Sequence, residues 1–129
     1  MRFSYRNEAA FSKAVVTVLR NRGWFVQRIE SGETGKGIPD LYCISPRNSA
    51  VWCELKRIHQ VVSLQDIVVP WRPGQQSWLH GVAMRKQNVC TLCCFDNYIA
   101  IIEHDKVYSA NRVSREDYTL ISDIKEIAR

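Results

Sequence analysis

Two stretches of the chain repeat apolar residues every three or four positions, which is the spacing of one face of a helix. The first stretch, residues 7–20, ends shortly before Gly23 and carries the apolar residues Phe11, Val15, Val18 and Leu19. The second begins at Gln75 and extends to about residue 86, with an apolar face made of Trp78, Leu79, Val82 and Ala83. The spacing predicts a helix over each stretch.

Short apolar runs bounded by turn-forming residues predict strands between and after these helices. They cover residues 24–29, 41–44, 50–56, 89–95 and 98–103, with residues 106–109 as a candidate extension. A last helix is predicted from Ser114 to about residue 128, because Ser-Arg-Glu-Asp at its start approximates a capping box. The order α, β, β, β, α, β, β, α predicts an α/β fold, with a mixed sheet flanked by helices.

Residues 57–74 follow neither period, and they are long for a connection without regular structure. The apolar residues that they contain include Val61, Val62, Ile67, Val68, Val69 and Trp71. We interpret this stretch as an insertion within a single domain spanning residues 1–129. We expect it to cover the functional site or to form a dimer contact.

The predicted strand at residues 50–56 has two chemically different faces. Glu54 and Lys56 are two positions apart, so their side chains project from the same face, which Trp52 shares. The opposite face carries Val51, Cys53 and Leu55. This pattern indicates a strand that packs a core on one side and shows an acid and a base to a cleft on the other. A structural salt bridge between Glu54 and Lys56 is the plain alternative.

Asp40 lies at the entrance of the preceding strand. A Gly-rich loop precedes it, and Pro39, whose backbone torsion is fixed, directs the chain from that loop into the strand. If the two strands form a hairpin through the turn at residues 45–49, Asp40 and Glu54 come close together. Two carboxylates at short range repel unless a cation joins them. A hard divalent ion such as Mg2+ takes oxygen ligands from one or two carboxylates and keeps positions for water and phosphate. Lys56 would face that water.

Glu8 belongs to the apolar stripe of the first predicted helix, since it precedes Phe11 by three positions and Val15 by seven. The helix would therefore turn this carboxylate toward the protein. The alternative is a first-turn glutamate that interacts favourably with the helix dipole.

The composition is that of an ordinary globular chain of 129 residues, with 46% hydrophobic and 24% charged residues, so disorder is not expected. No apolar run approaches the roughly 20 residues that cross a bilayer. The amino terminus lacks a secretory apolar core. The five cysteines lie in or beside apolar runs, which favours reduced thiols. We expect a cytoplasmic protein with no membrane partner.

The formal net charge of +5 favours a polyanionic partner. Three cations flank the acidic residues along the chain, where phosphates would pass: Lys36, Arg57 and Arg72. We interpret them as candidate DNA-binding residues, which give affinity and positioning without base specificity.

Taken in order, these features resemble the PD-(D/E)xK nuclease superfamily, and within it the VRR-NUC family. The resemblance spans residues 8–88, with 13 residues separating Asp40 from Glu54. It consists of Glu8 on the first helix, Gly-x-Pro-Asp-Leu ending at Leu41, Trp-x-Glu-x-Lys ending at Lys56, and a Gln-x-x-Trp helix start at Gln75. The departure from the family pattern is the long stretch at residues 57–74.

The resemblance implies a restriction-endonuclease-like core and a role for each matching residue. Asp40, Glu54 and the backbone carbonyl of Leu55 would hold Mg2+, for which Mn2+ would substitute. Glu8 would bind the metal through water or serve a second ion. Lys56 would orient or help to deprotonate the attacking water and stabilise charge on the phosphate. Gln75 would support Lys56 or the water. No organic cofactor is implied.

A stand-alone chain of this kind resembles Holliday-junction resolvases, often from bacteriophage. The resemblance therefore implies the cytoplasm of a bacterial or phage-infected host cell. The implied function is a metal-dependent DNA endonuclease that hydrolyses phosphodiester bonds and selects branched or four-way-junction DNA. Two symmetric cuts imply a homodimer. One alternative is a nuclease of the same family for flaps, nicks or single strands. Another is a non-catalytic DNA-binding scaffold, against which the two carboxylates argue, because phosphate binding alone does not favour them.

Overall fold

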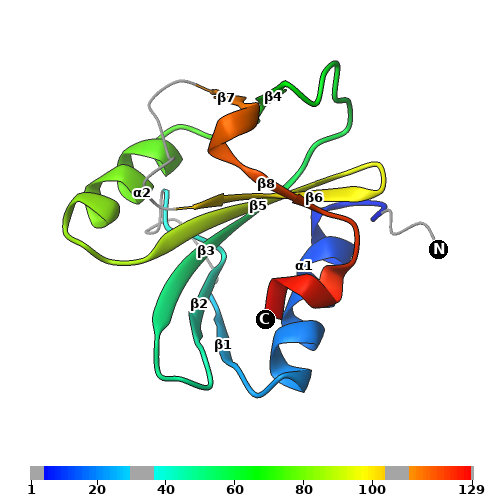
Figure 1. Cartoon of the computed structure of the whole chain (residues 1–129). Helices are drawn as coiled ribbons and strands as arrows, with labels where there is room; N and C mark the ends of the chain where they lie inside the picture. The colour runs from blue at the N-terminus through cyan, green and yellow to red at the C-terminus, as the bar shows by residue number, and fades with distance from the viewer. Residues whose placement is uncertain (1–4, 30–36, 104–110, 129) are drawn as a thin grey trace.

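A computed structural model of the chain describes residues 5–29, 37–103 and 111–128. At its centre is a six-stranded sheet in the order β1-β2-β3-β5-β6-β8 (Figure 1). Its strands are β1 Phe25–Arg28, β2 Leu41–Ile44, β3 Ala50–Arg57, β5 Val89–Phe95, β6 Tyr98–Glu103 and β8 Thr119–Ile121. Neighbouring strands are antiparallel except β3 and β5, which are parallel. The predicted mixed sheet is confirmed.

Helices cover both faces of this sheet (Figure 1). On one face, Phe11 of α1 (Glu8–Asn21) belongs to the same buried cluster as Cys53 of β3, together with residues of the 3-10 helix η3 (Ile124–Ala128). Leu79 of α2 (Gln75–Met84) packs with Trp52, the neighbour of Cys53 in β3. Consecutive residues of a strand point to opposite faces. The two helices therefore sandwich β3.

The first helix begins where the sequence predicts, because Asn7 caps it. The Asn7 side-chain oxygen accepts a hydrogen bond from the backbone N–H of Ala10 at 2.8 Å, which satisfies one of the first-turn donors. Phe11 and Val15 on the predicted stripe are fully buried. Burying one face of the helix fixes its rotation, and that rotation decides where the first-turn residue Glu8 points.

The predicted hairpin between β2 and β3 is also present. In its turn the backbone N–H of Ser45 donates to the backbone oxygen of Ser49, and the N–H of Ser49 donates to the Ser45 hydroxyl. Asn48 adopts a left-handed conformation with φ 66°, which asparagine tolerates better than most residues. The resulting register pairs Leu41 with Cys53. Asp40, one residue before Leu41, is thereby brought beside the middle of β3.

The prediction that residues 57–74 lack regular structure is wrong in part. β3 extends to Arg57, and Asp66–Val68 forms β4, which pairs with β7 (Arg112–Ser114) in a separate two-stranded sheet. Ile67 is buried in a cluster with Val113. The partner strand lies more than forty residues away in the sequence, so no local pattern could reveal the pairing.

The predicted last helix is wrong. The capping box at Ser114 exists, but it starts only the three-residue 3-10 helix η2 (Arg115–Asp117). The chain then becomes extended, and β8 pairs with Ile99, Ala100 and Ile101 of β6. An unpaired strand edge presents free backbone donors and acceptors. Covering the edge of β6 overrides the local helical signal.

The candidate extension at residues 106–109 lies outside the described residues. Within the described ranges, no helix is long and apolar enough to span a membrane. All five cysteines are free thiols. Four of them are buried, in agreement with their placement in apolar runs.

Candidate active site

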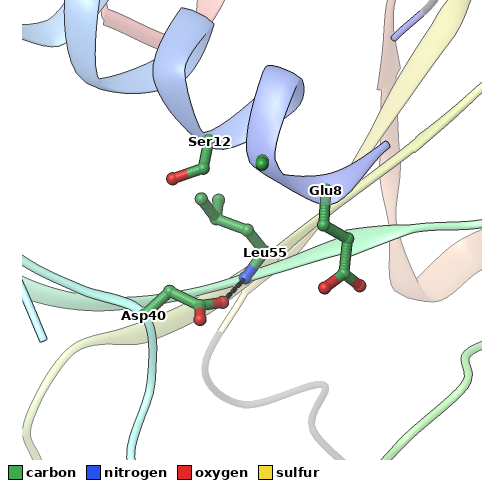
Figure 2. A pocket seen from close by; sticks show the side chains of 5 residues that line it. Glu8, Ser12, Asp40 and Leu55 are labelled. Carbon is green, nitrogen blue, oxygen red and sulfur yellow. Dashed lines mark hydrogen bonds between the residues drawn. The ribbon is translucent and has the colours of Figure 1, made fainter. Parts of the chain in front are cut away.

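Asp40 and Glu54 face each other across the β2–β3 hairpin. The Asp40 Oδ2 accepts a hydrogen bond from the backbone N–H of Leu55 at 2.9 Å (Figure 2), which holds the aspartate against β3. The carboxyl group of Asp40 also lies close enough to that of Glu54 to raise the pKa of Glu54. Strand pairing therefore produces the close pair of carboxyl groups that the sequence predicts.

Such a close pair is electrostatically unfavourable without a cation. Burial, then the hydrogen bond to Asp40 and the negative charge of Asp40, raise the pKa of Glu54 to about 9 from its ordinary value of 4.5. The nearby charge of Glu8 raises it further, while that of Lys56 lowers it. At neutral pH this shift favours the protonated form of Glu54.

The donor set fits a hard divalent cation. Glu54 is 2% exposed, and its Oε2 is buried without a hydrogen-bond partner. An unpaired buried carboxyl oxygen is costly, and coordination would satisfy it. Among the described residues no three His, Cys, Asp or Glu side chains cluster closely enough to hold a metal. Mg2+ nevertheless needs only one or two carboxylates, because water and phosphate complete its shell.

Lys56 brings a positive charge to the same face. It is 2% exposed, and as the second residue after Glu54 on β3 it projects from the side of the sheet that α2 covers. Burial raises the pKa of both Glu54 and Cys93, and the charge of Lys56 opposes this shift. Lys56 and Glu54 therefore lie on the same buried face of β3.

Glu8 reaches this area from the start of α1. Its Oε1 accepts a hydrogen bond from the backbone N–H of Arg57 at 3.3 Å, and its Oε2 lies 4.0 Å from Arg72 Nη2. A pocket of about 160 Å³ separates it from Asp40 and is lined by Glu8, Ala9, Ser12, Asp40 and Leu55 (Figure 2). The helix thus turns Glu8 toward the strand rather than leaving it only beside the helix dipole.

Gln75 is buried at the first turn of α2. Its side-chain oxygen accepts a hydrogen bond from the backbone N–H of Arg72 at 2.8 Å. That bond anchors the end of the insertion to the helix.

Gly37, which the sequence analysis treated only as part of a motif, joins two parts of the site. Its φ is +87°, and a Cβ there would lie 2.4 Å from the carbonyl oxygen of Gly74, the residue before α2. Only glycine accommodates both this torsion and this approach. The Gly-x-Pro-Asp motif could have indicated the role of Gly37, because it places a glycine three residues before Asp40.

The three candidate DNA-binding cations differ in their surroundings. Arg57 is half-buried and its guanidinium donates to the backbone oxygens of Tyr5 and Ile58, so it links the chain before α1 to β3. The Arg72 side chain is 75% exposed. Lys36 lies outside the described residues. Sequence reasoning also missed Ser12, which lines the pocket and accepts a hydrogen bond from Arg28 at 3.0 Å.

The architecture is similar to that of a known nuclease. The structure of Hjc, a Holliday junction resolvase from the archaeal hyperthermophile Archaeoglobus fulgidus, superposes with a TM-score of 0.66 at 12% sequence identity. The match covers 94% of this chain and 99% of the resolvase. The two chains share a fold. No protein-family model matches the sequence, and no curated protein matches it either.

Proposed function

We propose that this protein is a metal-dependent DNA endonuclease of the PD-(D/E)xK superfamily, similar to VRR-NUC proteins. The observation that carries the proposal is the contact between the Asp40 and Glu54 carboxyl groups, with buried Lys56 on the same strand face as Glu54. A structural salt bridge accounts for one acid beside one base. It does not account for a second carboxyl group held against the first.

Asp40 and Glu54 are the side chains that would hold the cation, with the backbone carbonyl of Leu55 as a further ligand. When bound, Mg2+ or Mn2+ supplies charge neutralisation of the phosphate and activation of water for hydrolysis. The hydrogen bond from the Leu55 N–H fixes Asp40 before the cation arrives. The site is thus organised by the backbone of β3.

The other residues act on the phosphate and on the water. Lys56 stabilises negative charge that develops on the phosphate and orients the attacking water. Such preorganised charge is effective because Lys56 is shielded from bulk solvent. Glu8 lies across the pocket, where it would reach a cation through water or serve a second ion. Gln75 would position the water or Lys56 with its amide nitrogen.

We propose branched DNA, in particular four-way junctions, as the substrate. The protein of this fold from Archaeoglobus fulgidus is a Holliday junction resolvase, and the net charge of +5 suits a polyanion. Exposed Arg72, 4.0 Å from Glu8, would contact phosphate at the mouth of the pocket. Paired cuts across a junction would come from a homodimer.

The proposal is tested by incubating the protein with end-labelled four-way junction, flap, linear duplex and single-stranded DNA, with Mg2+, Mn2+ or EDTA. We expect cleavage only with metal, and fastest on the junction. Asp40→Asn and Glu54→Gln should bind junction DNA and leave it uncut. Binding without cleavage under every metal condition would instead favour a scaffold role. Equal cutting of linear duplex would contradict junction selectivity while leaving the nuclease assignment intact.

A further inference from the structure

Two buried polar atoms without hydrogen-bond partners lie on neighbouring strands at the site. One is Glu54 Oε2 on β3 and the other is Oγ1 of Thr91 on β5. Thr91 is fully buried in the middle of its strand. Buried polar groups are nearly always paired, so two unpaired ones in the same place require an explanation.

The register of the sheet puts these residues side by side. Glu54 and Thr91 are direct partners in the parallel β3–β5 pairing. Val89 packs against α2, so Thr91, two positions later, points to the same face. Trp52 of β3 also packs there, and therefore Glu54 does too. Since paired strands run about 4.8 Å apart, the two side chains stand next to each other.

Apart from Glu54, the side chains that flank Thr91 within the sheet on this face have no oxygen. Ile102 is its direct partner on β6, and Val89 and Cys93 precede and follow it on its own strand face. Of these flanking side chains, only that of Glu54 has an oxygen that can accept a hydrogen bond from the hydroxyl. A hydroxyl rotates to suit its acceptor, and an ionised carboxylate accepts more strongly than a neutral carboxyl group.

We propose that Thr91 is a positioning residue whose hydroxyl donates a hydrogen bond to Oε2 of Glu54 when Glu54 is the carboxylate that holds the cation. The bond fixes the orientation of Glu54 and satisfies the lone pairs that face away from the cation. Hydrogen bonds of this kind to ligating side chains strengthen metal binding. The inference rests on the proposed function, because Thr91 can position a metal ligand only if Glu54 binds a cation.

The contrasting interpretation is a threonine that merely fills the core. In that case Thr91→Val, which replaces the hydroxyl with a methyl group of similar size, would leave cation binding unchanged. The two interpretations therefore differ in an equilibrium that does not depend on cleavage.

The test is the affinity of the DNA-free protein for Mn2+, measured by isothermal titration calorimetry. Thr91→Val should weaken Mn2+ binding by about 10- to 100-fold, whereas Thr91→Ser, which keeps the hydroxyl, should retain most of the affinity. Thr119→Val on the edge strand β8 is the matched control and should bind as the wild type does. Thr91→Ala replaces Thr91→Val if the valine variant does not fold. Wild-type affinity in the hydroxyl-free variant would overturn the proposal.

Glu54→Gln separates this inference from the proposed function. If Glu54→Gln abolishes Mn2+ binding and Thr91→Val leaves it intact, only the role of Thr91 is wrong. If Glu54→Gln also binds Mn2+ as the wild type does, the cation site itself is misassigned. Loss of binding in Glu54→Gln, weakening in Thr91→Val and recovery in Thr91→Ser would support both.

Discussion

At the scale of single residues, the close approach of Asp40 and Glu54 is the feature with the largest electrostatic consequence. The sequence predicts both residues, because Pro39 marks a strand entrance and Glu54 alternates with apolar neighbours. The sequence does not reveal how far the pKa of Glu54 is raised, since the size of that shift depends on the burial that α2 and β5 create.

This perturbation predicts a pH dependence of stability. Folded protein keeps a proton on Glu54 up to a pKa of about 9, while the unfolded chain releases it near the ordinary value of 4.5. The folded state binds more protons between these values, so the free energy of unfolding should fall as pH rises through that interval. The slope is at most about 1.4 kcal/mol per pH unit. Urea denaturation in EDTA from pH 5 to pH 9 measures it.

Glu54→Gln is the control for this titration, because glutamine stays neutral throughout. We expect the variant to show a flatter pH profile and to be more stable than the wild type at pH 8. Parallel pH profiles for the two proteins would show that Glu54 does not carry the raised pKa.

Gly37 supports a second prediction at this scale. Gly37→Ala would place a methyl group against the Gly74 carbonyl at a left-handed torsion, so we expect a loss of more than about 1 kcal/mol in the free energy of unfolding. Gly81→Ala, inside α2 with its nearest new contact at 3.6 Å, is the matched control and should be neutral or stabilising. Equal stability of the two variants would contradict the close packing of Gly37.

At the scale of elements, local pattern was sufficient where an element is specified by its own residues. The helix capped by Asn7 and the turn at Asn48 agree with the structure. The strand around Glu54 is present as predicted, but both of its faces are buried, whereas the sequence predicts that the charged face opens to a cleft. Local pattern failed at β4 and β8, whose existence depends on partners elsewhere in the chain. The capping box at Ser114 shows that a local motif can be present without the element it predicts, since this cap starts only a three-residue 3-10 helix.

The corrected insertion provides a prediction about its packing. Ile67 in β4 is 1% exposed and Val62, five residues earlier, is 95% exposed. Ile67→Ala should therefore lower the free energy of unfolding by about 2–5 kcal/mol, while Val62→Ala should change it little. Denaturant unfolding of both variants tests whether this segment is part of the folded core. Similar, small losses in both would mean that β4 is not packed as described.

At the scale of the whole molecule, the sandwich of α1, β3 and α2 explains why distant residues converge. Glu8, at the start of α1, accepts a hydrogen bond from β3. Gln75, at the start of α2, holds the backbone of Arg72, whose guanidinium lies 4.0 Å from Glu8. The sequence predicts these helix starts separately. Their convergence requires the sheet order, which places β3 in the interior of the sheet, between β2 and β5.

Paired cutting of a junction requires two sites, which predicts a dimer. Analytical ultracentrifugation should give twice the chain mass of 14.9 kDa, at least when junction DNA is present. A monomeric mass both free and on the junction would argue against paired cuts. It would leave the nuclease site itself untouched.

The central claim is that the Asp40, Glu54 and Lys56 constellation cuts DNA. Its most direct test is the single-turnover cleavage rate of a labelled four-way junction in Mg2+, for the wild type and for Lys56→Ala, with DNA binding measured alongside. Removing the buried charge should slow cleavage by about 100-fold or more while the affinity for the junction changes little. Wild-type cleavage by Lys56→Ala would contradict the claim.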